Sequence, residues 1–134
     1  VIAAMQDNGL PISELSYVET KYGIEEGARA FAQLMSATPK PTAIFCGNDV
    51  LAVGALRKAR EMGIDVPNDV SITGFDDIEL AQVVHPALTT VHVPHREMGR
   101  LAASALVRHL RDGAPLEIVE LQTHTVYRES LAPV

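Results

Sequence analysis

The amino-acid sequence predicts an α/β fold in which a parallel or mostly parallel β-sheet is sandwiched by helices. Short β-rich apolar runs alternate with helical runs along the chain. The central stretch Thr42–Asp77 has the order strand, helix, strand that joins parallel strands through a crossover. With 134 residues and 47% of them apolar, the chain can form one ordinary domain with a substantial core.

The first part of the chain predicts two helices and one strand. Val1–Asp7 has the pattern of a helix that Asn8-Gly9 closes, and Leu15–Glu19 is a candidate strand. Ile24–Met35 carries one apolar stripe, and two glutamates lie in its first turn, where the helix dipole favours carboxylates. Because the chain begins inside a plausible helix, we expect it to be a piece of a longer protein.

The central unit consists of two predicted strands and the helix between them. Thr42–Cys46 and Val70–Phe75 are short apolar runs with the length and composition of buried strands. Asn48 is placed to cap the helix, and Gly63 follows its last residues, where a left-handed ending is expected. The two strands are therefore expected to run in the same direction.

This geometry predicts a polar edge on the sheet. Asn48 and Asp49 follow the first of these strands, and Asp76 and Asp77 follow the second. Ligands of open α/β sheets bind outside the carboxyl ends of the strands. The sequence therefore predicts an acidic ligand site at this edge.

The last third of the chain continues the alternation. After a short helical turn and a strand, Pro94 opens the longest helix as a first-turn proline and Gly113 ends it. Two further strands are predicted beyond Gly113. The expected elements are Ile78–Val84, Thr89–Val93, Pro94–Arg111, Leu116–Leu121 and Thr123–Tyr127.

The central helix is unusual because residues 50–56 are apolar on every side. Such a helix is either buried all round or packs against a partner molecule. The sequence leaves both explanations open.

Composition and charge exclude several classes of function. The net charge is −6 and no basic run occurs, so these residues are poor candidates for contacting nucleic acid. The only cysteine, Cys46, fits a reducing, cytoplasmic compartment, and no apolar run is long enough to span a membrane.

His92 and His95 suggest zinc, but Pro94 lies between them and no third ligand is evident, so we expect neither metal nor cofactor. No nucleophile–base pair can be assembled, and we do not expect an enzyme.

Four blocks of sequence carry a family resemblance: PTAIFCGNDVLAVGAL, MGIDVPNDVSITGFDD, HPALTTVHVP and MGRLAASAL. Their order and spacing, from about Leu15 to Glu129, resemble the effector-binding core of LacI/GalR-family bacterial transcription regulators. The resemblance implies a type I periplasmic-binding-protein-like core of two lobes with the effector between them. Residues 1–92 and 123–134 would form the C-terminal lobe, and residues 93–122 would belong to the N-terminal lobe. The DNA-binding headpiece of this family is not among these residues, so operator binding would be a property of the longer protein.

The resemblance implies roles for four residues of the polar edge. Asp76 matches an aspartate that hydrogen-bonds the effector, and a carboxylate accepts well from sugar hydroxyls or purine N–H groups. A turn aspartate could instead cap the following helical turn, a role that Asp77 can take. Asn48 either caps its helix or also reaches the effector, Tyr22 either stacks on the ligand or is an ordinary exposed tyrosine, and His95 either lines the cleft or simply starts a helix.

The implied function is that of an effector-sensing, homodimeric regulator. The residues expected at the subunit interface are Val50, Val53, Leu56, Val83 and Val84. A periplasmic sugar-binding receptor of a transport system, which has the same fold, is the alternative. A phospho-acceptor receiver domain would need a further aspartate and a lysine at strand ends, which the sequence does not offer.

Overall fold

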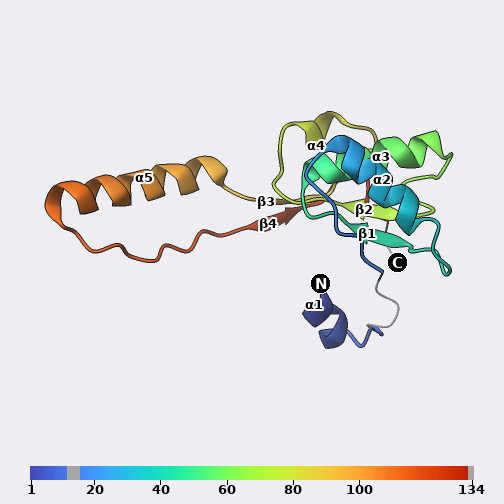
Figure 1. Cartoon of the computed structure of the whole chain (residues 1–134), viewed down its shortest axis with the longest axis horizontal. Helices are drawn as coiled ribbons and strands as arrows, with labels where there is room; N and C mark the ends of the chain where they lie inside the picture. Colours follow the sequence, from blue (N-terminus) through green and yellow to red (C-terminus); the bar gives the residue numbers. More distant parts are fainter. Residues whose placement is uncertain (12–15, 133–134) are drawn as a thin grey trace.

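The computed structural model describes residues 1–11 and 16–132 and has the expected α/β organisation. A compact body holds most of the elements, and a long arm that contains α5 projects from it (Figure 1). The elements in order are α1 (Ile2–Asp7), α2 (Ile24–Leu34), β1 (Ala43–Phe45), α3 (Asp49–Glu61), β2 (Ser71–Thr73), α4 (Leu80–Val83), β3 (Thr90–His92), α5 (His95–Asp112) and β4 (His124–Val126).

The strands follow one another in space in the order β1, β2, β3, β4. Strand β1 pairs with β2 in parallel, as the crossover predicted. Parallel bridges join Thr73 to Thr89 and Asp76 to His92, so β3 continues the parallel arrangement beyond β2. Strand β4 pairs with β3 in the antiparallel direction, with His92 opposite His124. The prediction of a mostly parallel sheet is therefore confirmed.

Helix α3 begins and ends where the sequence predicted. The side chain of Asn48 caps it by accepting a hydrogen bond from the backbone N–H of Leu51 (2.9 Å). Gly63 follows the helix in the left-handed conformation, with φ +67°, which a glycine adopts without steric cost. Apart from Asp49 at its start, its buried residues are small ones and one leucine, namely Ala52, Gly54, Ala55, Leu56 and Ala59.

Two glycines allow α2 and α3 to pack backbone against backbone. A Cβ atom on Gly27 would lie 2.1 Å from the carbonyl oxygen of Leu51, and one on Gly54 would lie 2.0 Å from that of Ile24. Such short distances are possible only without side chains. The core lies between this helix pair and the strands, and its largest fully buried apolar side chains are Phe31, Ile72, Leu88 and Val70.

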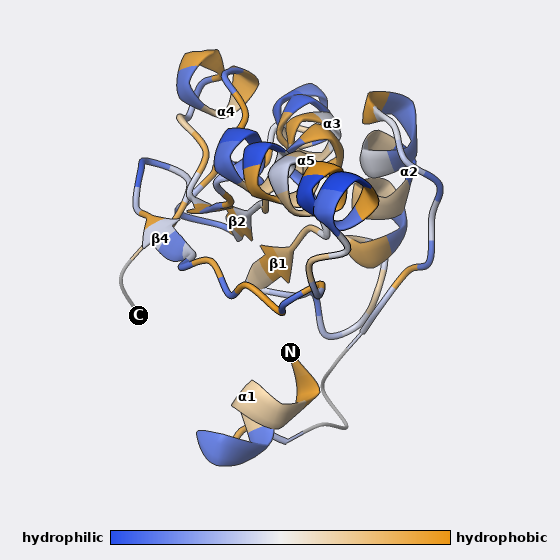
Figure 2. Ribbon diagram, turned by 90° about the vertical axis from the view of Figure 1, so that its left-hand side faces the viewer, coloured by the Kyte–Doolittle hydropathy of each residue, from blue (hydrophilic) through white to orange (hydrophobic). Residues whose placement is uncertain are grey.

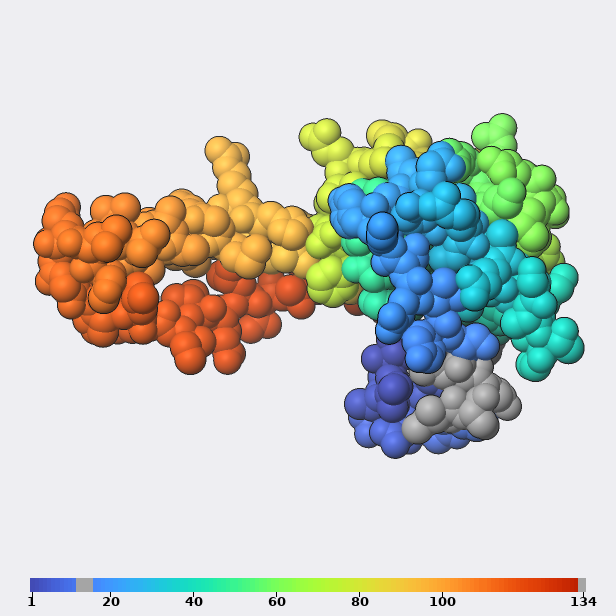
Figure 3. Space-filling view, in the orientation of Figure 1, coloured from blue at the N-terminus to red at the C-terminus, as the bar shows by residue number. Residues whose placement is uncertain are grey.

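The arm consists of α5 and the chain that returns from it to β4. In the space-filling view both project well beyond the body (Figure 3). No residue of α5 is buried, although the helix carries apolar and polar faces (Figure 2). The strand expected at Leu116–Leu121 is absent: this segment pairs with no described strand, and Ile118 is 94% exposed. The strand expected at Thr123–Tyr127 is present as β4.

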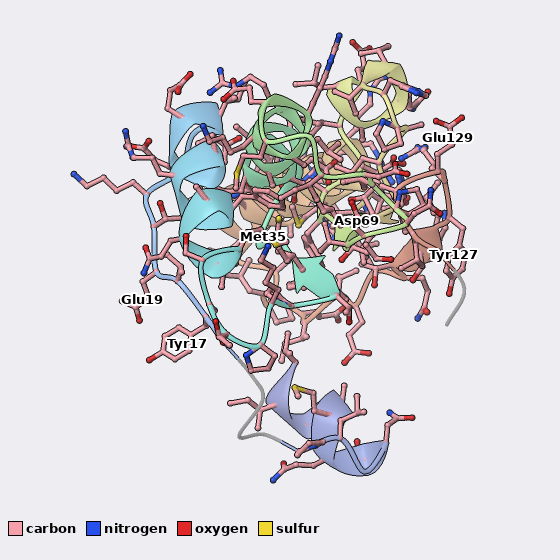
Figure 4. All side chains as sticks on the ribbon, turned by 90° about the vertical axis from the view of Figure 1, so that its right-hand side faces the viewer. Tyr17, Glu19, Met35, Asp69, Tyr127 and Glu129 are labelled. Carbon is pink, nitrogen blue, oxygen red and sulfur yellow. The ribbon has the colours of Figure 1, made fainter. Side chains whose placement is uncertain are left out.

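The strand expected at Leu15–Glu19 is not confirmed. Leu15 lies outside the described residues, and residues 16–19 are not part of a strand. A strand needs a hydrogen-bonded neighbour, and no backbone hydrogen bond joins residues 16–19 to the described part of β1. Figure 4 shows Tyr17 and Glu19 pointing outward from this segment, whereas Met35 lies inside.

Candidate functional site

The loops that follow β1 and β2 meet at one edge of the sheet, as the parallel arrangement predicted. The backbone N–H of Asp49 donates to the carbonyl oxygen of Phe75 (2.9 Å), which joins the two loops directly. Three carboxylates therefore lie close together at this edge, those of Asp49, Asp76 and Asp77. Their surroundings differ, and this difference decides what each of them can do.

Asp49 is a structural residue whose carboxylate is completely buried. One carboxylate oxygen accepts a hydrogen bond from the hydroxyl of Thr90 (2.5 Å), and the other accepts from the backbone N–H of Ile78 (2.9 Å). Gly74 makes room for it, because a Cβ there would lie 2.2 Å from the Asp49 carboxylate. Asp49 thus fastens the start of α3 to β3 and to the loop after β2.

Asp77 is also occupied by neighbours within the chain. Its Oδ1 accepts a hydrogen bond from the guanidinium of Arg128 (2.6 Å), and its Oδ2 lies 2.9 Å from Nδ1 of His92. Burial raises the pKa of this carboxyl, but the hydrogen bonds from Arg128 and His92 outweigh burial and hold the pKa below its ordinary value. The expectation that Asp77 caps the helical turn after it is wrong, because its carboxylate faces β3 and β4 and Asp49 accepts the N–H of Ile78 instead.

Asp76 is the edge acid whose carboxylate stays available. No hydrogen bond from the described residues reaches its side chain, which is 29% exposed; Nε2 of His95 lies 3.4 Å from its Oδ1. Its backbone is held by a hydrogen bond from its N–H to the carbonyl oxygen of Val91 (3.0 Å) and has φ +114°. A non-glycine residue with such a backbone is strained, and strain of this kind concentrates at functional sites.

The other three predicted ligand residues differ in their relation to Asp76. His95, the first residue of α5, is half exposed and adjacent to it. Asn48 uses its side-chain oxygen as the helix cap, and within the described chain its NH₂ group has no acceptor. Tyr22 is strongly exposed just before α2, and no described contact joins it to the other three.

Two cavities lie near these elements. One of about 500 Å³ is located where β3 passes into α5 and is lined by His92, Val93, Pro94, His95, Arg96, Glu97 and Arg100. A larger one of about 1070 Å³ lies between α1, α2 and β1, and none of the four predicted ligand residues lines it. The smaller cavity is the one that adjoins the polar edge, because His95 belongs to both.

Arg128, His92 and His124 also belong to this region; Arg128 and His124 were missed as site residues, and His92 was considered only as a zinc ligand. Arg128 follows β4 in the chain and reaches Asp77 across 51 positions of sequence. The rings of His92 and His124 lie on paired positions of β3 and β4, with centroids 5.0 Å apart. Only the pairing of β3 with β4 brings these residues to the edge, so a local sequence pattern gives no sign of them.

Neither a metal centre nor a reactive thiol is evident in the part of the chain that the structure describes. No three His, Cys, Asp or Glu side chains among residues 1–11 and 16–132 converge on a possible metal position. Cys46 is buried, and burial, together with the negative charge of Asp49, raises its thiol pKa to about 12. Within the same ranges, no helix is long and apolar enough to cross a membrane.

Comparison with known proteins identifies the family. Residues 1–131 match the periplasmic binding protein-like domain. The chain belongs to this family. Over 131 residues it is 35% identical to the HTH-type transcriptional repressor PurR of Photorhabdus laumondii, covering 97% of the chain and 38% of that repressor. It is 37% identical over 132 residues to PurR of Proteus mirabilis, of which it covers 39%. The chain thus spans about two fifths of the length of the curated relatives that it matches.

Solved structures of periplasmic binding protein-like cores agree with this assignment. A LacI family transcriptional regulator from Enterococcus faecium with bound ribose matches 99% of the chain, with a TM-score of 0.92 and 29% identity, over 49% of its own length. The complex of the transcriptional regulator CelR with cellobiose matches 96% of the chain, with a TM-score of 0.85 and 30% identity, over 39% of its own length. The resemblance to LacI-family regulators is therefore confirmed.

Proposed function

We propose that this chain is the C-terminal part of the effector-sensing core of a bacterial transcriptional repressor, and that its effector is a sugar or a related small metabolite. The observation that carries the proposal is the open carboxylate of Asp76. Asp49 and Asp77 are fully used within the chain, whereas Asp76 presents an acceptor at the edge where ligands of such sheets bind. Ribose and cellobiose, the ligands in two related structures, carry the hydroxyl donors that a carboxylate accepts.

The shape of the chain supports a division between two lobes. Residues 1–92 and 123–134 would form one lobe, and residues 93–122 would belong to the other. The arm buries no residue of α5, and it exposes large apolar side chains, namely Met98, Leu106, Val107, Leu110, Leu116, Ile118 and Val119. An amphipathic helix is stable when its apolar face is covered, so this face fits a position against the rest of the second lobe.

The named relatives favour a regulator over a transport receptor, because the repressors match 97% or more of the chain. Such a repressor would work in the cytoplasm, and operator DNA would be contacted by other parts of the protein, since this part carries a net charge of −6. An enzymatic function has no support at this edge, where the buried Cys46 is not a nucleophile.

We also propose that the protein binds a second copy of itself and forms a homodimer. Val50 and Val53 on α3 are only partly buried, and Val83 at the end of α4 is strongly exposed. Val84 next to it is also partly buried, whereas Leu56 belongs to the core of the chain and has little surface left for a partner. The proposed interface therefore rests on the four valines.

The test of the effector site is the substitution Asp76→Ala in the full-length protein. Donors of a buried ligand that lose a charged acceptor remain unpaired, at a cost of ~1.5–3 kcal/mol, or about tenfold or more in affinity. We expect the response to effector to be lost while operator affinity without effector is unchanged. The measurement is operator affinity with and without ribose, cellobiose or purine bases.

Glu79→Ala is the matched control, because Glu79 is an exposed acid of the same loop and has no side-chain hydrogen bond among the described residues. Its response to effector is expected to equal that of the unaltered protein. A normal response in Asp76→Ala would show that the effector does not bind this carboxylate.

A further inference from the structure

The turn that carries Asp76 is strained at two successive residues. Asp76 has φ +114° and Asp77 has φ +56°, both in the region that favours glycine. Neither residue is a glycine, so each of these conformations costs free energy and persists only where surrounding contacts enforce it. The contacts that enforce this turn therefore decide where the Asp76 carboxylate points.

Four contacts from three other parts of the chain hold the turn. Strand β3 supplies the carbonyl oxygen of Val91 for the Asp76 N–H and the ring of His92 for Asp77. The start of α3 supplies the Asp49 carboxylate for the N–H of Ile78. The chain after β4 supplies Arg128, whose contact is the shortest of the four at 2.6 Å and joins opposite charges.

Arg128 is itself held in place by the two residues that precede β3. Its second guanidinium nitrogen donates to the carbonyl oxygen of Leu88 (2.8 Å), and its backbone N–H donates to the hydroxyl of Thr89 (2.9 Å). Its side chain is only 15% exposed and that of Asp77 only 12%. The planar guanidinium meets both acceptors at once, whereas a lysine ammonium is a compact point charge on a flexible stem. The ion pair is therefore partly shielded from water and fixed in direction.

We propose that Arg128 is a positioning residue for effector binding: by anchoring Asp77, it holds the strained turn so that the neighbouring Asp76 carboxylate faces the ligand edge. Arg128 does not touch the Asp76 side chain in this structure, and it acts through the residue between them. The inference rests on the proposed role of Asp76 as the effector acceptor. It adds that the end of β4, far from Asp76 in sequence, controls effector affinity.

The experiment compares Arg128→Met with Arg57→Met in the full-length protein. Arg57 is likewise paired with a carboxylate, that of Glu25, through two hydrogen bonds (2.7 and 2.8 Å), but this pair joins α2 and α3 on the surface. The two substitutions therefore remove the same chemical group at different places. Amide hydrogen exchange at Asp76 and Ile78 reports on the turn, and calorimetric titration with ribose, cellobiose and purine bases reports on affinity.

We expect Arg128→Met to speed exchange at both amides and to weaken binding tenfold or more, with folding confirmed by circular dichroism. Arg57→Met should change neither the exchange rates nor the affinity. Arg128→Lys should restore only part of the affinity, because lysine keeps the positive charge but lacks the planar guanidinium that bonds two acceptors at once. A merely structural role would alter stability in both variants and affinity in neither. If Arg128→Met does not fold, Asp77→Asn removes the same charge pair with almost no change of shape and should give the same two effects.

The outcomes separate this inference from the proposed function. Unchanged exchange at Asp76 and Ile78 in a folded Arg128→Met protein overturns the positioning role, whatever the ligand. Faster exchange with unchanged affinity overturns it as well, because the turn would then not matter for binding. If the unaltered protein binds none of the probes, or if Asp76→Ala binds them normally, the effector assignment fails, while amide exchange still decides whether Arg128 holds the turn.

Discussion

Gly54→Ala tests whether the close contact of α2 with α3 is essential to the fold. In the middle of a helix, alanine is normally better than glycine by ~0.5–1 kcal/mol. Here the new Cβ would lie 2.0 Å from the carbonyl oxygen of Ile24 and 2.8 Å from the backbone nitrogen of Ala28. These are backbone atoms of α2 that cannot rotate away, so the helices must separate by about 1.4 Å to restore ordinary contact at 3.4 Å.

The clash should outweigh the gain in helix propensity. Overpacking a close-packed core costs ~1–3 kcal/mol, and a clash with backbone belongs at the upper end of that range. We therefore expect a net destabilisation of ~2 kcal/mol after the propensity gain of ~0.5–1 kcal/mol is subtracted. Separation of the helices would also loosen Phe31, which is buried in the core.

The assay is urea denaturation of the chain followed by circular dichroism, with Gly99→Ala as the matched control. Gly99 lies inside α5, and a Cβ there would meet no atom within 4 Å. The same substitution should therefore be neutral or stabilising by up to ~1 kcal/mol at that site. The reasoning is refuted if Gly54→Ala is as stable as the unaltered chain, or if both variants shift in the same direction by the same amount.

Two further predictions concern the surface and the core. Aspartate at both Val53 and Val83 should give monomers in sedimentation experiments on the full-length protein, because charges would replace apolar side chains at the proposed interface; a dimer at low micromolar concentration would contradict that interface. The thiol of Cys46 has an ordinary pKa of 9.0 and a folded pKa of about 12, so the stability that it contributes is complete below pH 9 and is lost as the pH rises towards 12. Cys46→Ala should flatten the pH dependence of the urea midpoint in this range, and an unchanged slope would show that this thiol is not the group responsible.

The sequence was most informative where the information is local. The cap at Asn48 and the left-handed glycine after α3 were both predicted, because each depends on residues within one helical turn. The apolar surface of α3 left two explanations open, and the structure shows why. The buried part packs on α2 and the strands through Gly54 and Ala55, and Val50 and Val53 keep part of their surface exposed.

The errors concern elements that depend on a distant partner. Leu116–Leu121 has the composition of a strand, but a strand forms only beside another, and this segment lies along the projecting arm. Asp77 was the acid expected to cap the turn after it, but Asp49 accepts the N–H of Ile78 instead, for a similar reason. The choice between two neighbouring acids as the partner of Ile78 depends on how α3 meets β3, through the bond between Asp49 and Thr90.

The same dependence on distant partners explains how a ligand at Asp76 would influence the rest of the protein. Of the two strands that connect the body with the arm, β3 ends at the polar edge and β4, which is antiparallel to it, begins there. His95 opens α5 beside the Asp76 carboxylate, and Arg128 follows β4 and binds the next residue, Asp77. A ligand that binds Asp76 therefore contacts or neighbours groups on both connections. A ligand shifts a conformational equilibrium only through its different affinity for the two states. A ligand group that donates a hydrogen bond between Asp76 and His95 would have a different affinity for two states that differ in the position of the arm relative to the body.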